Sequence, residues 1–411
     1  MLRFLTAGES HGQGLVIIVE GLPAGLRVDV DRMTADLRQR QGGYGRGRRM
    51  SIESDRAEIL SGVRRGVTTG APVSMLIRNR DWTNWQATMH VEAEMPEDAT
   101  GARRGPVVRP RPGHADLAGV LKYDLDDIRD VLERASARET AARVAVGALA
   151  RQLLATVDIE IASHVLSIGG AGLIDTPAVP FDRIRGVGER SSVRCVDSAA
   201  EAAMIAAIDA ARANGDTVGG AFEVVARGVP VGLGSHVHWD RKLDGRLAQA
   251  VMSIHAVKAV AIGEGVAGAH RPGSRVHDEI VMVESRDGTA EIARPTNRAG
   301  GLEGGITTGE DVRVTGYMKP ISTLMKPLRS VDLTTLEEAP AAIERSDVCA
   351  VPAAAVVGEA MVAIVLAEAL LERFGGDSVR QLKVHVAAAA ERVAGRVRRP
   401  GRSEDALDPP A

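Results

Sequence analysis

The stretch "PAAAVVGEAMVAIVLAEALLERFGG" at residues 352–376 has the most strongly apolar helical pattern in the chain. Apolar side chains recur through every turn, and two glycines end the pattern as helix caps do. The 411-residue chain is 45% hydrophobic, yet it has only three Trp, three Tyr and four Phe. We therefore expect a large core built from Ala, Val, Leu and Ile, with this helix as part of it.

Helix and strand patterns recur in both halves of the chain. The first half predicts a strand, a helix, paired strands, a long helix and a further strand, at 14–25, 29–41, 57–79, 124–157 and 159–170. The second half predicts a helix at 198–216, a strand with a glycine turn at 219–235, and a helix at 243–263. This recurrence predicts an α/β (α+β) layered fold that is pseudo-duplicated, although no sequence repeat is visible.

Composition excludes several classes of protein. The net charge is −3, so no overall field attracts the chain to nucleic acid. Cys195 and Cys349 are its only cysteines, which argues against a disulfide framework and a structural zinc site, and we expect no bound metal. The N-terminal segment lacks the apolar region of a signal peptide, and no run approaches the ~18 continuous apolar residues of a membrane span. We expect a cytoplasmic protein with no nucleic-acid or membrane partner.

Polar segments rich in glycine lie between the patterned elements. "RQRQGGYGRGRRM" (38–50) holds five arginines and four glycines in thirteen positions. "GESHGQG" presents His11 just before a strand, and "RPRPGHADLAG" (109–119) presents His114 beside Arg109 and Arg111. Glycine lets backbone N–H groups approach an anion, and arginine binds phosphates and carboxylates. Each histidine segment read alone also fits a plain surface loop, whereas the two together favour a site.

A fourth glycine segment lies near residue 300. "TNRAGGLEGGITTG" (296–309) has five glycines and is followed by "MKPISTLMKP", in which Lys319, Ser322 and Thr323 are donors suited to a phosphate ester. No strand–GxGxxG–helix unit and no GxxxxGK[ST] loop are present. Any nucleotide-like cofactor is therefore expected to bind outside those two folds.

Seven of these segments, taken in order, closely resemble the chorismate synthase family. They span residues 1 to about 376 and read "AGESHGQGLVIIVEGLPAG", "RQRQGGYGRGRRM", "RPRPGHADLAGVLKY", "VLERASARETAARVAVGAL", "TNRAGGLEGGITTG", "MKPIST" and "RSDVCAVPAAAVVGEAMV". The resemblance implies a single catalytic domain at 1–376, with 377–411 forming the end of a helix and a disordered polar tail. It also implies a sandwich with a helical layer between antiparallel sheets, and a homotetramer.

The resemblance implies a lyase reaction as well. In the shikimate pathway, 5-enolpyruvylshikimate 3-phosphate loses phosphate by a 1,4-anti-elimination to give chorismate, and reduced FMN is required without net redox change. The substrate carries a phosphate and two carboxylates, so fixed cations must offset their charge in a dry site. The substrate-binding residues implied are Arg40, Arg46, Arg49, Arg111 and Arg138, with Arg134 in support.

Residue roles follow by the same resemblance. His11 would give a proton to the departing phosphate, with Ser10 and Ser136 as relays. His114 would stabilise the reduced flavin, and Asp347 would help to pass on the proton from C6 of the substrate. The implied flavin-binding residues are Arg134, Ala135, Ser136, His255, Ala256, Gly304, Lys319, Pro320, Ile321, Ser322, Thr323 and Arg345.

Some features depart from the family pattern or leave alternatives open. "SIHAVKAVAIGEGV" (253–266) differs from the commoner pattern, with His255 where Asn or Gln is typical, which affects the expected flavin contacts. An RNA-binding role for 38–50 fits poorly, because the segment occurs once in an acidic chain. A flavin-dependent oxidoreductase that binds NADPH at Arg40 and Arg46 remains the alternative enzyme, and NADPH is also a possible source of reducing equivalents.

The remaining histidines, tryptophans and cysteines are assigned no chemistry. His236 and His238 are expected to form a strand pair facing one side, and Trp82 and Trp85 to anchor a loop by packing. Surface or core-edge positions are expected for His90, His164 and His385. Both cysteines are expected to be inert.

Overall fold

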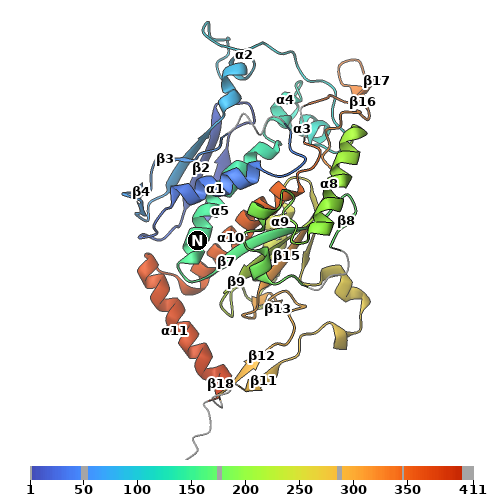
Figure 1. Cartoon of the computed structure of the whole chain (residues 1–411). Coiled ribbons are helices and arrows are strands. Elements are labelled where there is room, and N and C mark those ends of the chain that lie inside the picture. Colours follow the sequence, from blue (N-terminus) through green and yellow to red (C-terminus); the bar gives the residue numbers. More distant parts are fainter. Residues whose placement is uncertain (1, 48–53, 174–177, 285–288, 345–346, 400–411) are drawn as a thin grey trace, which may run out of the picture.

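The computed structural model describes residues 2–47, 54–173, 178–284, 289–344 and 347–399 (Figure 1). Its central helix α10 (Val351–Phe374) is the helix expected at 352–376, and it is buried along almost its whole length. It packs on α5 (Thr140–Ala155), α1 (Val30–Gln41) and α9 (Leu243–Met252). A Cβ added at Gly147 of α5 would lie 2.3 Å from the Ala360 Cβ, so glycine and alanine allow these two helices to approach closely.

Helix α10 also tests the expectation that the chain has no candidate membrane span. Among the described residues it is the one helix long and apolar enough to cross a membrane, but 89% of its apolar window is buried inside the protein. A soluble core helix passes the same test of length and composition. The burial therefore favours a core helix over a membrane span.

Two antiparallel sheets enclose the helices. The first has the order β1 (Arg3–Ala7), β2 (Gly14–Glu20), β6 (Val73–Arg78), β3 (Glu58–Ile59). On β2, Leu15, Ile17 and Val19 are buried while alternate residues are exposed, as expected of a strand with one covered face. The second sheet has the order β10 (Val257–Ile262), β15 (Val312–Met318), β9 (Gly220–Arg227), β7 (Glu160–Ile168), β8 (Ala171–Gly172).

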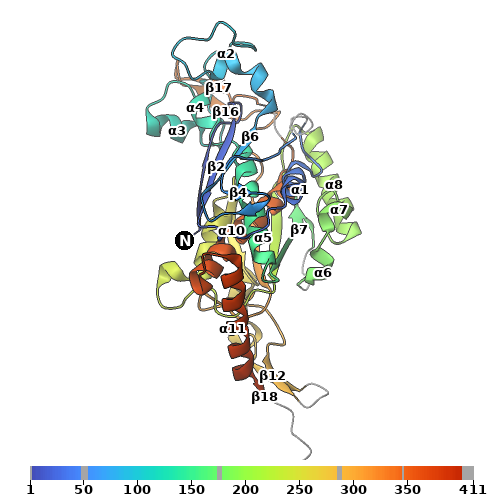
Figure 2. The same cartoon turned by 90° about the vertical axis from the view of Figure 1, so that its left-hand side faces the viewer.

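The layers are clearest in the view of Figure 2, where α5 and α10 lie between β2 and β6 on one side and β7 on the other. Helix α8 (Ser198–Ala213) covers the outer side of the second sheet through β7 and β8. The expected sandwich, with a helical layer between antiparallel sheets, is confirmed.

Two predicted helices were too long. The pattern at 124–157 is interrupted, because α4 (Arg129–Leu132) is followed by the loop 133–136, a 3₁₀ turn (Ala137–Glu139) and only then α5. Ser136 is extended, with φ −70° and ψ 143°, and its hydroxyl accepts from the Arg138 N–H. The predicted helix at 243–263 likewise ends at Met252, and β10 pairs with β15 instead. The β-branched pattern of β10 and the left-handed Ala256 (φ 65°) explain the change.

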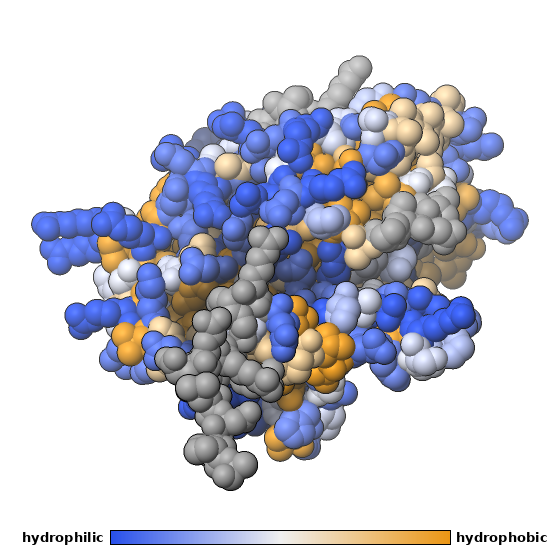
Figure 3. Space-filling model, turned by 60° about the horizontal axis from the view of Figure 1, so that its bottom comes forward, coloured by the Kyte–Doolittle hydropathy of each residue, from blue (hydrophilic) through white to orange (hydrophobic). Residues whose placement is uncertain are grey.

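The region after residue 376 also differs from expectation. Where only the end of a helix was expected, helix α11 (Val379–Val397) begins with a capping box formed by Ser378 and Gln381. It leads to a small sheet of β11 (Val281–Glu284), β12 (Ala290–Ala293) and β18 (Arg398–Arg399), which lies away from the main body (Figure 1). Exposed apolar residues such as Met282, Ile292 and Val384 belong to this end, and the view from below shows apolar groups interspersed with hydrophilic ones (Figure 3).

The remaining elements are short. They are β4 (Val63–Arg64), β5 (Val67–Thr68), the 3₁₀ helix Arg80–Asn84, α2 (Gln86–Met89), α3 (Asp116–Tyr123), α6 (Phe181–Ile184), α7 (Val187–Arg190), the 3₁₀ helices Trp239–Arg241, Gly265–His270 and Gly273–Arg275, β13 (Leu302–Glu303), β14 (Ile306–Thr307), β16 (Arg329–Asp332) and β17 (Glu337–Pro340).

Three further histidines, His164, His236 and His238, lie outside the expected site. His164 is wholly buried on β7, contrary to expectation, with Nε2 2.9 Å from Glu223 Oε2 on β9. The expected strand pair of His236 and His238 was wrong, because both lie in a bend before a 3₁₀ helix. His238 Nδ1 lies 2.7 Å from Asp240 Oδ1 at the surface.

Candidate active site

His11 lies in the loop between β1 and β2, where the chain turns at one end of the helical layer. Its Nδ1 lies 2.8 Å from Glu133 Oε1, and its backbone N–H donates to Glu133 Oε2 at 2.8 Å. Glu133 belongs to the break between α4 and α5, and its carboxylate is buried. The indole of Trp85 stacks on the imidazole, with ring centroids 3.9 Å apart and planes 22° apart. The interrupted helix therefore provides the carboxylate that holds this histidine.

The two candidate relay serines meet beside His11. The Ser136 hydroxyl donates to the Ser10 hydroxyl at 3.1 Å, and the Ser10 N–H donates to the Glu133 carbonyl at 3.1 Å. Ser10 is almost fully buried. The structure thus brings Ser10, His11 and Ser136 together, as the resemblance implied.

Arg40 and Arg138 share one buried carboxylate. Arg138 Nη1 donates to Asp55 Oδ1 at 2.5 Å, and Arg40 Nη1 donates to Asp55 Oδ2 at 3.4 Å. Arg40 Nε also donates to the Thr140 hydroxyl at 2.9 Å. Burial, together with the neighbouring Arg138 and Arg46, lowers the pKa of Arg40 to about 9. Two guanidinium groups therefore meet at one described carboxylate.

Asn79 connects the arginines to the His11 loop. Its Nδ2 donates to the carbonyls of Glu9 and Gly12, at 3.0 and 2.8 Å, and its Oδ1 accepts from Arg138 Nε at 2.9 Å. Asn79 follows β6 and is nearly fully buried. The position of Arg138 and the course of the His11 loop are therefore coupled through one amide.

His114 lies in the loop 109–116, directly before α3. Its Nδ1 is 2.5 Å from Asp116 Oδ1, and Arg111 donates to Asp116 from its backbone N and from Nε, at 3.0 and 2.8 Å. Gly113 has φ 80°, as expected for the glycine that turns this loop. Burial opposes ionisation, but the hydrogen bonds from His114 and Arg111 outweigh it and hold the pKa of Asp116 well below its usual range.

The segment 319–323 contacts the His114 loop. Lys319 Nζ donates to the Gly113 carbonyl at 2.6 Å, and Arg111 Nη1 donates to the Thr323 hydroxyl at 3.1 Å. A Cβ at Gly113 would lie 3.6 Å from the Ser322 Cβ. The expected donors of this segment therefore lie beside His114.

Arg46 and Asp347 form an ion pair of 2.6 Å between Nη1 and Oδ2. The Gly47 N–H donates to the other oxygen of Asp347, also at 2.6 Å. Both residues contribute to the electrostatic environment of Arg40, so this pair lies near the Arg40–Asp55–Arg138 group. Asp347 precedes the N-terminus of α10, so the central helix carries it to the site.

His255 lies in the electrostatic field of the His114 loop and of the arginines. Burial, together with the charges of Arg143, His114 and Arg40 and against that of Glu139, lowers the pKa of His255 to about 4. Its Nδ1 is buried and has no hydrogen-bond partner among the residues that the structure describes. A neutral imidazole with an unused ring nitrogen is suited to a hydrogen bond with a bound ligand.

Not every expected residue lies in this cluster. The exposed Arg134 points back to β1, where it donates to the carbonyls of Thr6 and Gly8. Gly304 turns the β13–β14 hairpin near His236. The Ile321 carbonyl accepts from Thr217. Arg49 and Arg345 lie outside the described residues. Ala135 follows Arg134 in the loop that contains Glu133. The Ala256 carbonyl accepts from the Lys319 backbone N–H, and Pro320 is the next residue along the chain.

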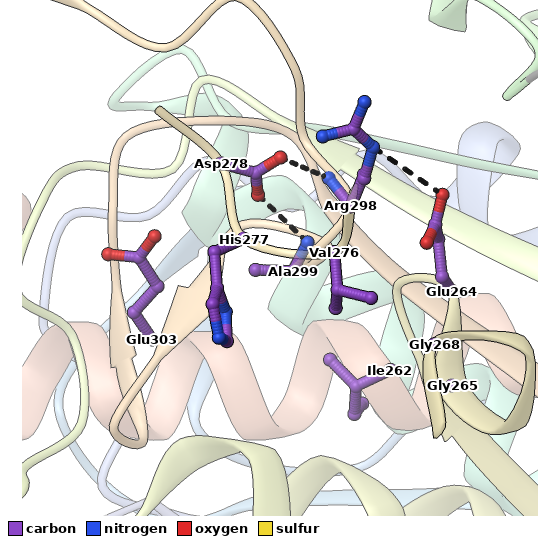
Figure 4. A pocket seen from close by; sticks show the side chains of 10 residues that line it. All are labelled: Ile262, Glu264, Gly265, Gly268, Val276, His277, Asp278, Arg298, Ala299 and Glu303. Atoms are coloured by element: carbon purple, nitrogen blue, oxygen red, sulfur yellow. Dashed lines mark hydrogen bonds and ion pairs between the residues drawn. The ribbon is translucent and has the colours of Figure 1, made fainter. Parts of the chain in front are cut away.

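A cavity of about 460 Å³ lies elsewhere, at the end of β10 (Figure 4). It has an apolar floor with Ile262 and Val276, and its lining carries one arginine against three carboxylates. Asp278 already accepts from the N–H groups of Arg298 and Ala299. This mostly acidic lining would repel a polyanion. Its members are Ile262, Glu264, Gly265, Gly268, Val276, His277, Asp278, Arg298, Ala299 and Glu303.

Thiols and metal clusters contribute little here. Burial raises the pKa of Cys349 to about 11 and also raises that of Cys195, so both thiols are poor nucleophiles. Within the described ranges, no three His, Cys, Asp or Glu side chains group as metal ligands would.

Sequence reasoning missed the groups that hold the site together. Glu133, Asp116, Asp55 and Asn79 were not singled out, and Trp85 was treated as a packing residue. Asp116 stands two residues after His114 and could have been found by that spacing. Nothing in the local sequence links Glu133 to His11, or Asp55 to Arg40.

Comparisons with known proteins agree with this geometry. The family model described as chorismate synthase matches residues 2–371. The chain is 59% identical over 391 residues to the chorismate synthase of Moorella thermoacetica, covering 94% of this chain and 98% of the relative. It is 54% identical over 395 residues to that of Solibacter usitatus, covering 96% and 99%.

A solved structure described as the crystal structure of chorismate synthase superimposes with a TM-score of 0.75. It is 41% identical to this chain, and the match covers 96% of this chain and 98% of the other. By sequence over almost its full length and by fold, the chain belongs to the chorismate synthase family, lyases of the shikimate pathway for aromatic amino acid biosynthesis.

Proposed function

We propose that the protein converts 5-enolpyruvylshikimate 3-phosphate to chorismate by 1,4-anti-elimination of phosphate, with reduced FMN and no net redox change. The observation that carries this proposal is the pair of carboxylate-held imidazoles: the His11 loop is linked to the buried Arg138 through Asn79, and His114 lies beside the buried Arg111. An acid and a cation cluster are what the departure of a phosphate from a polyanion needs.

Charge at the site favours an anionic substrate. Most cations are already paired, Arg46 with Asp347 and Arg111 with Asp116. Among the described residues, Arg40 and Arg138 share the carboxylate of Asp55, and the Lys319 ammonium donates to the Gly113 carbonyl. Arg40, Arg46, Arg111 and Arg138 would bind or orient the substrate, and Arg49 remains a proposed contact outside the described residues.

His11 would donate the proton that neutralises the departing phosphate. The hydrogen bond between Ser136 and Ser10 lies beside His11 and would relay a proton to the His11 loop. Asp347, held by Arg46 and the Gly47 N–H, would help to carry away the proton lost from C6. Each role uses a group that the fold holds in place before substrate binds.

The residues present fit a flavin. The buried, unpartnered Nδ1 of His255 provides a place for one hydrogen bond, and Lys319, Ser322 and Thr323 provide donors next to His114. We propose that these residues, with Ala135, Ser136, Ala256, Pro320 and Ile321, hold FMN. Arg134 and Gly304, which lie apart from this cluster, and Arg345, outside the described residues, remain further proposed contacts. When bound, reduced FMN supplies the electron-rich ring that the C–O and C–H cleavages require.

Assembly, domain extent and location belong to the same proposal. We propose a homotetramer of one catalytic domain at residues 1–376, working in the cytoplasm. The outer face of the first sheet exposes Leu5, Val16 and Ile18, and Leu5 pairs with Ile18 across β1 and β2. Exposed aliphatic side chains on neighbouring strands support a contact between subunits.

Anaerobic turnover of 5-enolpyruvylshikimate 3-phosphate with chemically reduced FMN tests the proposal. We expect chorismate and phosphate in equal amounts, with the flavin still reduced at the end. The same assay with NADPH and oxidised FMN separates the alternative enzyme: one NADPH consumed for each product would indicate an oxidoreductase. NADPH needed only to start turnover would indicate that the chain reduces its own flavin.

A further inference from the structure

The buried carboxylate of Glu133 contacts the His11 segment three times. Oε2 accepts from the His11 backbone N–H at 2.8 Å, and Oε1 and Oε2 lie 2.8 and 3.0 Å from His11 Nδ1. The Glu133 carbonyl also accepts from the Ser10 N–H at 3.1 Å. An ionised carboxylate only accepts hydrogen bonds, so Nδ1 must carry the hydrogen. Nε2 is then the ring nitrogen left to act on a ligand.

Trp85 fixes the plane of the same ring. Its indole lies 3.9 Å from the imidazole at 22°, and its own Nε1 donates to Asp81 Oδ2 at 3.0 Å. The guanidinium of Arg104 lies 4.0 Å from the Trp85 ring centroid. The indole is almost fully buried, so it leaves the imidazole little freedom to tilt.

We propose that Glu133, supported by the Trp85 stack, is the positioning residue that makes Nε2 of His11 the proton donor to the departing phosphate. The inference rests on the proposed function. The proton passes from Nε2 to a phosphate oxygen, while the pair of electrons of the breaking C–O bond leaves with the phosphate. His11 is left neutral, with its Nδ1–H still bonded to Glu133.

Glu133→Gln is the most direct test. An amide has one accepting oxygen, whereas two N–H groups of His11 point at this side chain. If the amide oxygen of the introduced glutamine accepts from the His11 backbone N–H, the amide NH₂ faces the imidazole. Nδ1 must then accept a hydrogen bond from that NH₂, so it cannot carry a hydrogen itself. Nε2 would carry the hydrogen in the neutral ring. Removal of the anion would also make a positively charged imidazole less favourable.

Two measurements separate positioning from a merely structural role. In a W82F/W239F background Trp85 is the only indole, and protonation of the stacked imidazole should quench its fluorescence. We expect the pH midpoint of quenching, without added flavin, to fall by about one unit or more in E133Q. The quenching should vanish in H11N. With reduced FMN supplied, kcat of E133Q should fall roughly 10–100-fold, with KM changed much less.

Glu223→Gln is the matched control. Glu223 makes a buried contact with His164 of the same kind, at 2.9 Å, but in the second sheet. We expect E223Q to lose thermal stability and to keep the Trp85 quenching midpoint. E133D retains a carboxylate and should recover part of both kcat and the midpoint.

The proposal is wrong if E133Q keeps the wild-type quenching midpoint, whatever happens to kcat. It is also wrong if E133D restores nothing while remaining folded. Failure of the wild-type protein to release phosphate would overturn the proposed function instead. The fluorescence test would still decide whether Glu133 controls the protonation of His11.

Discussion

The two site histidines are held in the same way by partners of very different origin. Each imidazole has its Nδ1 against a buried carboxylate, at 2.8 Å for His11 and 2.5 Å for His114. Asp116 follows His114 by two residues, at the first position of α3, whereas Glu133 is 122 residues from His11 in the sequence. One pair is therefore made by a loop, and the other is made only when β1, β2 and the α4–α5 break come together.

The surroundings of the two carboxylates differ as well. Asp116 also accepts from the backbone and side chain of Arg111, a permanent cation. Among the described arginines and lysines, Glu133 pairs with Arg129, at the longer distance of 3.7 Å. Removal of Asp116 would leave the buried Arg111 without its counter-ion, whereas removal of Glu133 would mainly leave His11 without its hydrogen-bond partner. The first pair is thus expected to matter more for stability and the second more for orientation of the acid.

Removal of the imidazoles themselves should have the largest effect and should separate their roles. We expect H11A to lower kcat about 10²–10⁴-fold with reduced FMN supplied, because a general acid contributes that much. Its affinity for reduced FMN should not change. H114A should weaken the binding of reduced FMN more than that of oxidised FMN, as measured by anaerobic titration. Equal near-native rates for both variants would contradict the assignment.

The carboxylates should show the next largest effect. D116N should destabilise the fold by about 3–5 kcal/mol, because it leaves the buried Arg111 without its counter-ion. E133Q should lower the free energy of unfolding by a smaller amount. The low pKa of Asp116 means that its stabilisation is present above the usual value of 3.8 and is lost as pH falls to its lower folded-state value. Urea unfolding at pH 7 and pH 3 measures both effects, with the exposed D240N as control.

The architecture was largely predictable from the sequence, because periodicity reports burial. The apolar pattern of 352–376 became the buried α10, and the apolar run expected as a buried strand at 14–25 became β2, of which only one face is covered. The errors came where two short elements shared one long pattern. Nothing local indicates that 133–136 leaves the helix, since Glu133 to Ser136 read as acceptable helix residues. Tertiary contacts with His11 and Arg138 decide it.

The site was predictable in its charged residues and not in their connections. Arginines and glycine-flanked histidines can be recognised from the composition of their segments. Asp116 could be found from its position two residues after His114. Glu133, Asp55 and Asn79 meet their partners from other elements, so only the three-dimensional structure identifies them. The pairing of most site arginines with carboxylates was likewise not apparent from the sequence. The segment 38–50 looks strongly cationic, whereas Arg40 and Arg46 each face a carboxylate in the fold.

Arg46→Ala should have a moderate effect on substrate binding. Arg46 is more accessible than Arg40, and it holds Asp347 at 2.6 Å. We expect KM for the phosphorylated substrate to rise roughly tenfold, because a fixed charge used by both the ground state and the transition state is lost. A much larger fall in kcat than rise in KM would show instead that Arg46 acts chiefly through Asp347. D347N, which keeps the shape and removes the charge, is the comparison.

His255→Asn should have the smallest effect, and it tests whether His255 is buried beside the His114 loop and Arg40. Burial, together with the charges of Arg143, His114 and Arg40 and against that of Glu139, lowers the pKa of His255 from 6.5 to about 4. Between pH 6.5 and pH 4 the unfolded chain takes up a proton that the folded protein refuses, so stability falls as pH falls through this window. H255N removes that loss, and its unfolding midpoint should fall less steeply than that of the wild type over the same range. Parallel curves for the two proteins would mean that His255 is solvated, and the proximity of the His114 loop to Arg40 would lose its electrostatic support.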